Sequence, residues 1–255
     1  MLVTIDIGNS NVVLGFFDDK GLKAHQRFPT IKDATVEHYT KQFTKLVERE
    51  VPSTGVDGVA ISSVVPSLNS VFDQLTRQLF GTLPLFISYQ LRTGLTYDID
   101  NPATLGADRL ANATAAFDLY GGPSIVVDLG TAVTYEVIDE DGAFLGGAIS
   151  PGIGISYDAL ITNASLLTKV PLRFPQYVIG KNPQDAVQSG LIYGFSSMID
   201  GMVERIEQEL GIEESIVIGT GGFSELVASQ TESFTHVNPN LTLEGLRIIW
   251  EKNRL

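Results

Sequence analysis

The sequence predicts an α/β protein of two duplicated lobes, each a mixed β-sheet covered by helices. In both halves of the chain, apolar runs typical of strands alternate with segments of helical spacing. Residues 3–20 also align with residues 125–142, so that Asp128 falls under Asp6. The offset of 128 − 6 = 122 residues is close to half of the 255-residue chain. Solenoid repeats have much shorter periods, so the offset indicates duplication of a whole lobe.

The first half contains five segments typical of strands and three typical of helices. Segment 67–80 is the clearest helix, because its apolar residues recur at helical spacing. The pair Asn101-Pro102 favours the start of the next helix, since proline is well tolerated in a first helical turn. The expected strands span residues 2–6, 11–17, 22–28, 57–62 and 83–87, and the expected helices span 35–50, 67–80 and 102–120.

The second half repeats this scheme after the Gly121-Gly122 pair, which ends the preceding helix. Each half therefore gives the order βββαβαβα, which predicts a mixed sheet with helices packed on it. We expect two domains, residues 1–120 and 121–255, with a cleft between the lobes and both Asp-apolar-Gly turns at its mouth. The expected strands span 124–129, 132–138, 143–150 and 215–218, and the expected helices span 155–167, 182–210 and the closing stretch LTLEGLRIIWEKN.

The composition argues against several classes of function. The chain is 44% hydrophobic and 18% charged, which is ordinary for a globular protein. Its formal net charge of −13, without a basic cluster, disfavours nucleic acid or an anionic membrane as the main partner. The absence of cysteine excludes disulfides and thiolate chemistry, and the three histidines lack metal-ligand spacing. Without a signal-peptide pattern or a membrane-spanning run, we expect a cytoplasmic protein.

The turn DIGNSN, residues 6–11, is more polar than a hairpin requires. A tight hairpin is the simpler interpretation, because Gly and Asn tolerate positive φ. The second copy, DLGTA, favours a functional interpretation: Gly8 allows backbone N–H groups near an anion, and the polar side chains that follow it add donors. Asp6, at a strand end, is a candidate Mg²⁺ ligand, directly or through water. In the second copy the hydroxyl of Thr131 is a candidate phosphate donor.

These segments resemble the superfamily of sugar kinases, actin and the heat-shock chaperone ATPases, whose fold is ribonuclease H-like. The finer resemblance is to type III pantothenate kinase, and it spans nearly the whole chain. GADR, DLGTA and ISPG in this order are specific together. The matching segments are DIGNSN (6–11), ISSVVP (61–66), DNPATLGADRLAN (100–112), VDLGTAVT (127–134), GGAISPGI (146–153), AVQSG (186–190), GTGG (219–222) and LTLEGLR (241–247).

The resemblance implies a kinase that uses ATP, Mg²⁺ and K⁺ or NH₄⁺ to phosphorylate pantothenate to 4′-phosphopantothenate, the first step of coenzyme A biosynthesis. It makes Asp108 the catalytic base and Asp128 the ligand of the monovalent cation. GTGG resembles the adenosine-binding turn, although a Gly-rich turn after a strand is common. The implied pantothenate contacts are Gly106, Ala107, Asp108 and Arg109. The implied ATP contacts are Asp6, Ile7, Gly8, Asn9, Ser10, Asn11, Val12, Val13 and Thr131.

The residues of GADR suit the implied chemistry. Asp108 falls on a helix with a partly buried face, where a carboxylate is costly unless it is paired or used. Transfer of a phosphoryl group to an alcohol needs an acceptor for the hydroxyl proton, and an aspartate is the usual choice in kinases. Arg109 can bind a substrate carboxylate through paired hydrogen bonds. The alternative interpretation is that the two residues only form surface ion pairs.

Two positions depart from the family pattern. Ile99 stands where the family usually has a tyrosine before DNP, and Pro183 stands where it usually has a substrate-contacting threonine after GKN. Both changes fall on the pantothenate side, which keeps two other hypotheses open: a kinase of another small alcohol, and an inactive regulatory homologue. The resemblance also implies a homodimer, for which the apolar-striped helix 182–210 is a candidate contact.

Overall fold

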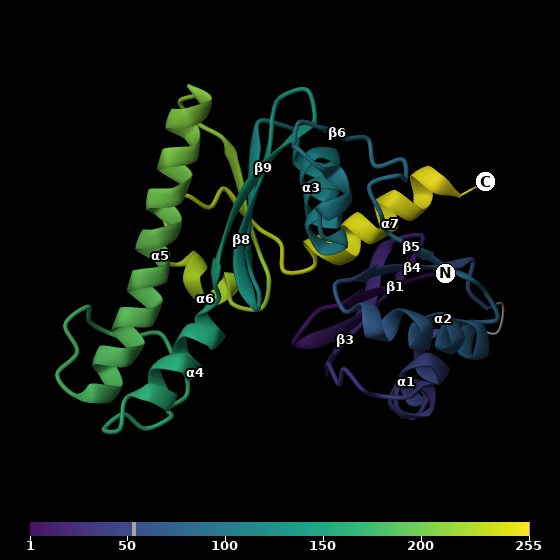
Figure 1. Ribbon diagram of the computed structural model, residues 1–255, viewed down its shortest axis with the longest axis horizontal. Coiled ribbons are helices and arrows are strands. Elements are labelled where there is room, and N and C mark those ends of the chain that lie inside the picture. Colours follow the sequence, from purple (N-terminus) through teal and green to yellow (C-terminus); the bar gives the residue numbers. More distant parts are fainter. Residues whose placement is uncertain (53–54, 255) are drawn as a thin grey trace. The chain divides into compact units, whose positions relative to one another are not determined.

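The computed structural model describes residues 1–52 and 55–254, which form two compact units (Figure 1). The first unit comprises Met1–Leu95, Asp100–Asp118 and Leu241–Leu255, and the second comprises Thr96–Ile99 and Leu119–Asn240. This partition differs from the expected division at residue 120, because the last helix groups with the first half of the chain. A short strand before residue 100 groups with the second half. Both groupings depend on long-range contacts, which local sequence patterns do not reveal.

The first unit contains a five-stranded sheet in the order β3-β2-β1-β4-β5. β1, β2 and β3 pair antiparallel, whereas β1, β4 and β5 run parallel, as the predicted order of elements requires. Its elements are β1 (Leu2–Ile7), β2 (Asn11–Asp18), β3 (Gly21–Pro29), α1 (Val36–Glu50), β4 (Gly58–Ser63), α2 (Pro66–Phe80), β5 (Pro84–Phe86), a 3₁₀ turn (Pro102–Thr104), α3 (Ala107–Tyr120) and α7 (Leu241–Asn253).

The two faces of this sheet differ in what they carry. One face holds the core, where alternate side chains of β1, β2 and β4 pack with α1 and α2, and the rings of Tyr39 and Phe72 lie 4.9 Å apart. The opposite face carries Thr4 and Asp6, since side chains alternate along a strand. Helix α7 packs against β1 and β4. In Figure 1, α1 and α2 lie on one side of these strands and α7 on the other.

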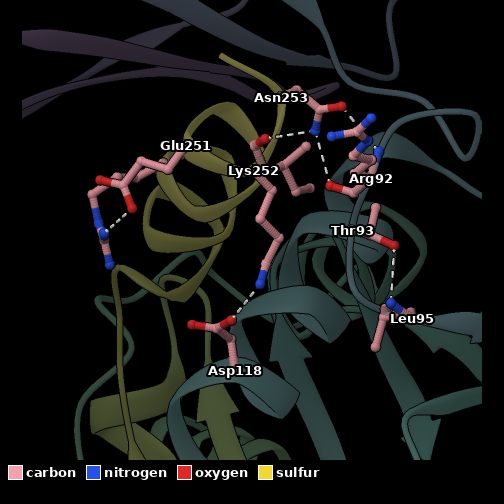
Figure 2. A network of polar contacts seen from close by, with 9 residues as sticks. Arg92, Thr93, Leu95, Asp118, Glu251, Lys252 and Asn253 are labelled. Carbon is pink, nitrogen blue, oxygen red and sulfur yellow. Dashed lines mark hydrogen bonds and ion pairs between the residues drawn. The ribbon is translucent and has the colours of Figure 1, made fainter. Parts of the chain in front are cut away.

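Polar contacts anchor the end of α7 within the first unit (Figure 2). The amide nitrogen of Asn253 donates to the carbonyl of Arg92 (2.9 Å), and its amide oxygen accepts from the Arg92 backbone N–H (3.0 Å). Lys252 forms an ion pair of 2.9 Å with Asp118 of α3. Segments far apart in the sequence are thereby joined, which explains why the C-terminal helix belongs to this unit.

The second unit contains a six-stranded sheet in the order β11-β10-β7-β8-β9-β6. Its run β9-β8-β7-β10-β11 has the same order as β3-β2-β1-β4-β5, so the predicted duplication is confirmed at the level of topology. Two helices, α4 and α5, occupy the first helical position of this copy. The elements are β6 (Thr96–Tyr97), β7 (Ser124–Leu129), β8 (Ala132–Ile138), β9 (Ala143–Pro151), α4 (Ile153–Asn163), α5 (Pro183–Leu210), β10 (Ile216–Thr220), α6 (Ser224–Ala228) and β11 (His236–Val237).

The core of the second unit lies between its sheet and the long helix α5. Buried side chains of β7, β8 and β10 pack with Ile199 and Val203 of α5. Phe195, Met198 and Met202 also face this core. Across residues 1–52 and 55–254, no helix combines the length and apolar character needed to cross a membrane.

Candidate functional site

The first Asp-apolar-Gly turn connects β1 to β2 and is held by three hydrogen bonds. The N–H of Gly8 donates to the Asn11 carbonyl (2.9 Å), which closes the turn. The hydroxyl of Thr30 donates to the Gly8 carbonyl (2.7 Å), and the backbone N–H of Thr30 donates to the Ser10 carbonyl (3.0 Å). The Gly8 amide is therefore engaged within the turn, so an anion would have to be bound by other groups of residues 9–11.

The side chains of this turn divide into two groups. Asn9 and Ser10 are exposed, and Asp6, Asn11 and Val13 are partly buried. The side chains of Ile7 and Val12, in contrast, lie fully within the core. Of the eight residues predicted to contact ATP here, these two can offer only their backbone to a ligand.

The second turn connects β7 to β8 and is one residue shorter than the first. The N–H of Gly130 donates to the carbonyl of Ala132, two residues ahead (3.0 Å), whereas Gly8 donates to Asn11, three residues ahead. Asp128 is partly buried at the end of β7, and Thr131 is exposed at the tip of the turn. Both predicted residues are therefore placed where a ligand at this end of the sheet can reach them.

Three separate segments meet around Asp128. β10 pairs in parallel with β7, which brings Thr220 opposite Asp128, and Gly221 follows in a left-handed conformation with φ of 86°. A Cβ atom on Gly221 would overlap with the Oδ1 atom of Asp128. The N–H of Gly152, from ISPG, donates to the Thr131 carbonyl (3.1 Å). DLGTA, ISPG and GTGG thus meet around Asp128, where glycine allows the backbone to approach the carboxylate closely.

Asp108 lies in the first turn of α3, within the same unit as the Asp6 turn. The Asp108 carboxylate accepts a hydrogen bond from the Arg109 N–H (2.8 Å) and folds back over Gly106, where a Cβ would lie 2.6 Å from its Oδ1 atom. The same Cβ would lie 3.7 Å from Val64, whose N–H donates to the carbonyl of Ile7 (3.0 Å). GADR therefore lies at the edge of the sheet where β1 and the DIGNSN turn meet.

The environment of Asp108 shifts its protonation equilibrium. Burial raises the pKa of the Asp108 carboxyl above its ordinary 3.8, while the N–H and the charge of Arg109 act in the opposite direction. Desolvation is the larger effect. A carboxylate with a raised pKa is a stronger proton acceptor, which is the property that a general base needs.

Asp6 and Asp128 are the candidate cation ligands at the strand ends. Among the described residues, no cluster of three or more acidic or histidine side chains is able to enclose a metal ion. Mg²⁺ in phosphoryl-transfer sites commonly uses one or two carboxylates, with phosphate oxygens and water as its other ligands. Asp6 at a strand end fits that requirement. Asp128 is likewise a single carboxylate at a strand end, and the backbones of Gly130 and Gly221 approach its Oδ1 atom closely, since a Cβ on Gly130 would lie 3.2 Å from that atom and a Cβ on Gly221 would overlap with it.

Comparison with known proteins identifies the family. A family model described as type III pantothenate kinase matches residues 2–205. The type III pantothenate kinase of Roseiflexus sp. (strain RS-1) is 48% identical over 255 residues, which covers 100% of both chains. That of Moorella thermoacetica (strain ATCC 39073 / JCM 9320) is 41% identical over 254 residues, 99% of this chain and 100% of its own. The chain belongs to the type III pantothenate kinase family.

Several solved structures share the fold of this chain at low sequence identity. One is component A of the (R)-2-hydroxyglutaryl-CoA dehydratase of Acidaminococcus fermentans, with a TM-score of 0.58, 13% identity and coverage of 97% and 95% of the two chains. Another is the inorganic polyphosphate/ATP-glucomannokinase of Arthrobacter sp. strain KM, with a TM-score of 0.51, 20% identity and 98% coverage of each. The expected relation to the sugar kinase and actin-like ATPase fold is thereby confirmed.

The two departures from the type III pantothenate kinase pattern have local structural roles. Ile99 lies in the second unit, where it is a neighbour of Gly146 on β9. Pro183 is the exposed first residue of α5, directly after Asn182, whose side chain accepts from the Asp185 N–H (2.9 Å). Proline is favoured at that helical position, so Pro183 contributes to starting the helix.

Two contributors to the site were not predicted from the sequence. Thr30 fixes the first turn from the end of β3, and no local pattern marks a threonine after an amphipathic strand as a turn anchor. Gly221 was quoted only as part of a Gly-rich turn. The signal for its role is the pairing of β10 with β7, which becomes visible once the duplicated strand order is extended to the second lobe.

Proposed function

We propose that this chain transfers the γ-phosphoryl group of ATP to the primary hydroxyl of pantothenate and so forms 4′-phosphopantothenate, the first intermediate of coenzyme A biosynthesis. The observation that carries the proposal is the position of Asp108. It is a partly buried carboxylate with a raised pKa, at the same edge of the sheet as the Asp6 turn. Full-length similarity to type III pantothenate kinases supports the choice of acceptor.

In the proposed reaction, Asp108 accepts the proton of the pantothenate hydroxyl while the oxygen of that hydroxyl bonds to the γ-phosphorus. The bond between that phosphorus and the bridging oxygen of ADP breaks, so ADP leaves with the electron pair. Arg109 binds the substrate carboxylate through paired hydrogen bonds, and the backbone of Gly106 and Ala107 lies close to the acceptor. These roles keep the hydroxyl oriented toward Asp108.

The nucleotide contacts follow from the two turns. We assign the ATP phosphates to the exposed Asn9 and Ser10, the partly buried Asn11 and the hydroxyl of Thr131, while Ile7, Gly8, Val12 and Val13 form the part of the turn that presents these groups. Asp6 would hold Mg²⁺, and Asp128 would hold K⁺ or NH₄⁺. The bound cations supply charge neutralisation at the phosphates.

We also propose that the protein is a cytoplasmic homodimer that binds neither nucleic acid nor membrane, in keeping with its charge of −13. The second unit exposes large apolar side chains on α4 and on the segment 164–182, including Leu166 (93% exposed) and Ile179 (80%). Monomers rarely expose such a group without a partner. We therefore place the contact there, next to α5, whose Phe195 and Met198 face the core instead. A monomeric mass in light scattering at micromolar concentration would refute the proposed homodimer.

The experiment that tests the function is ADP release from Mg·ATP, with and without pantothenate, in K⁺ buffer and then in Na⁺ buffer. We expect release that depends on pantothenate and is faster in K⁺. ATP binding without stimulation by pantothenate would instead favour one of the two alternatives. A panel of small alcohols then separates a kinase with another acceptor, for which Ile99 and Pro183 argue, from an inactive regulatory homologue.

A further inference from the structure

Two buried hydroxyl groups occupy equivalent places in the two halves of the fold. Ser62 is the neighbour of Asp6 in the parallel pairing of β1 with β4. Thr220 is the neighbour of Asp128 in the parallel pairing of β7 with β10. The aspartates are the residues that the duplication aligns, and each has a hydroxyl residue at the same register position on the next strand.

The backbone after the two hydroxyls is similar, although the returning N–H comes two residues after Ser62 and three residues after Thr220. After each of them the chain turns, and a backbone N–H returns to the carbonyl that follows the aspartate. Val64 donates to Ile7 (3.0 Å) in the first unit, and Phe223 donates to Leu129 (3.3 Å) in the second. Each of these hydrogen bonds therefore holds the end of its strand beside the neighbouring one, which keeps the hydroxyl residue at the register position of the aspartate.

Both hydroxyls lower the stability of the fold at their buried positions. Ser62 is 0% exposed and Thr220 is 1% exposed, and neither Oγ nor Oγ1 has a hydrogen-bond partner among the described residues. A buried hydroxyl that makes no hydrogen bond destabilises a fold, and alanine or valine would fill the same space without that cost. Since neighbouring residues of a parallel pair share a face of the sheet, the nearest strong acceptor by register is the aspartate carboxylate.

We propose that Ser62 and Thr220 are positioning residues, each of which donates its hydroxyl hydrogen bond to the neighbouring aspartate when that aspartate holds its cation. Ser62 would orient Asp6 toward Mg·ATP, and Thr220 would orient Asp128 toward the monovalent cation. Their burial prevents direct contact with a ligand, so they act through the carboxylates. The inference rests on the proposed function, because it takes the cation roles of the two aspartates from it.

The test measures binding without pantothenate, so that it does not depend on the acceptor. Calorimetry gives the Kd of Mg·ATP and of ATP in EDTA, and a K⁺ titration gives the concentration for half-maximal tightening of ATP binding. Loss of a hydrogen bond that orients a metal-ligating group costs roughly 10- to 100-fold in affinity. We expect Ser62→Ala to lose that much affinity for Mg·ATP, while its affinity for ATP in EDTA stays unchanged. We expect Thr220→Val to show a similar loss in its response to K⁺, and Thr220→Ser to restore that response.

The matched controls are the buried hydroxyls of Thr4 and Ser124, which also have no hydrogen-bond partner among the described residues. They lie on the aspartate strands, but opposite Ala60 and Ile216 on the next strands. Thr4→Val and Ser124→Ala should leave both cation dependences unchanged. If Ser62→Ala and Thr220→Val behave like these controls, the inference is wrong and the function stands. If the unaltered protein binds no Mg·ATP, the proposed function fails and the inference fails with it.

Discussion

The carboxylate of Asp108 lies in the first turn of α3, where the helix amides favour a negative charge and burial opposes it. Burial has the larger effect and raises the pKa of Asp108 above 3.8. A group whose pKa is higher in the folded than in the unfolded state stabilises the fold at low pH, and that stabilisation is lost as pH rises through the folded pKa. At neutral pH the ionised side chain therefore destabilises the fold.

Replacement of this side chain by a neutral one should stabilise the protein. We expect Asp108→Asn to raise the Tm at pH 7, because the amide needs no charge solvation and its oxygen still accepts from the Arg109 N–H. The gain should disappear below pH 3.8, where Asp108 is protonated in both states. Calorimetric unfolding from pH 3 to 8 measures this. A Tm that falls equally at every pH would contradict the account of burial.

The conformation of Gly221 gives a second prediction at the residue scale. In Gly221→Ala, the added Cβ overlaps with the carboxylate of Asp128, so we expect the K⁺ dependence to weaken by roughly 10-fold or more. Gly121 is the matched control, since its φ of 87° is nearly the same but its Cβ would meet nothing within 4 Å. Gly121→Ala should lose about 1–2 kcal/mol of stability from backbone strain. Gly221→Ala should lose more, because its Cβ would also lie 2.7–2.8 Å from the backbone of Leu129. Equal K⁺ dependence in the two variants would refute the proposed cation site.

The contacts of the C-terminal helix give a prediction at the scale of elements. Asn253 joins α7 to the Arg92 backbone through two hydrogen bonds, and Lys252 joins it to Asp118 through an exposed ion pair (Figure 2). We expect Asn253→Ala to lower the free energy of unfolding by about 1–2 kcal/mol, because two backbone groups lose their partner. Lys252→Ala should lower it by less than about 1 kcal/mol. Urea unfolding measures both losses. A larger loss for Lys252→Ala than for Asn253→Ala would contradict the roles given to these two side chains.

The long, periodic elements could be predicted from the sequence, and the short ones could not. Helices α1, α2 and α5 begin and end within a residue or two of their expected bounds, because caps and apolar spacing mark them. Strands β6 and β11 have two residues each, too few for any alternation to be recognised. The expected helix 102–120 begins as a 3₁₀ turn, and α3 starts only after Gly106.

At the scale of the whole molecule, the duplication made the most informative prediction. It placed Asp6 and Asp128 at equivalent strand ends, and the repeated strand order confirms that equivalence. The grouping of α7 with the first unit was not predictable, because it depends on contacts between residues some 160 positions apart, such as Arg92 and Asn253. The buried hydroxyls of Ser62 and Thr220 were also missed, since a single hydroxyl in an apolar strand is common.

The measurement that tests the central claim most directly is the turnover of Asp108→Asn with Mg·ATP and pantothenate. The account predicts a loss of roughly 10²- to 10⁴-fold, the usual contribution of a positioned base, together with unchanged ATP binding and a Tm that is not lowered. Such a result would separate the chemical role of Asp108 from any structural one. Turnover close to that of the unaltered protein would contradict the assignment of Asp108 as the base.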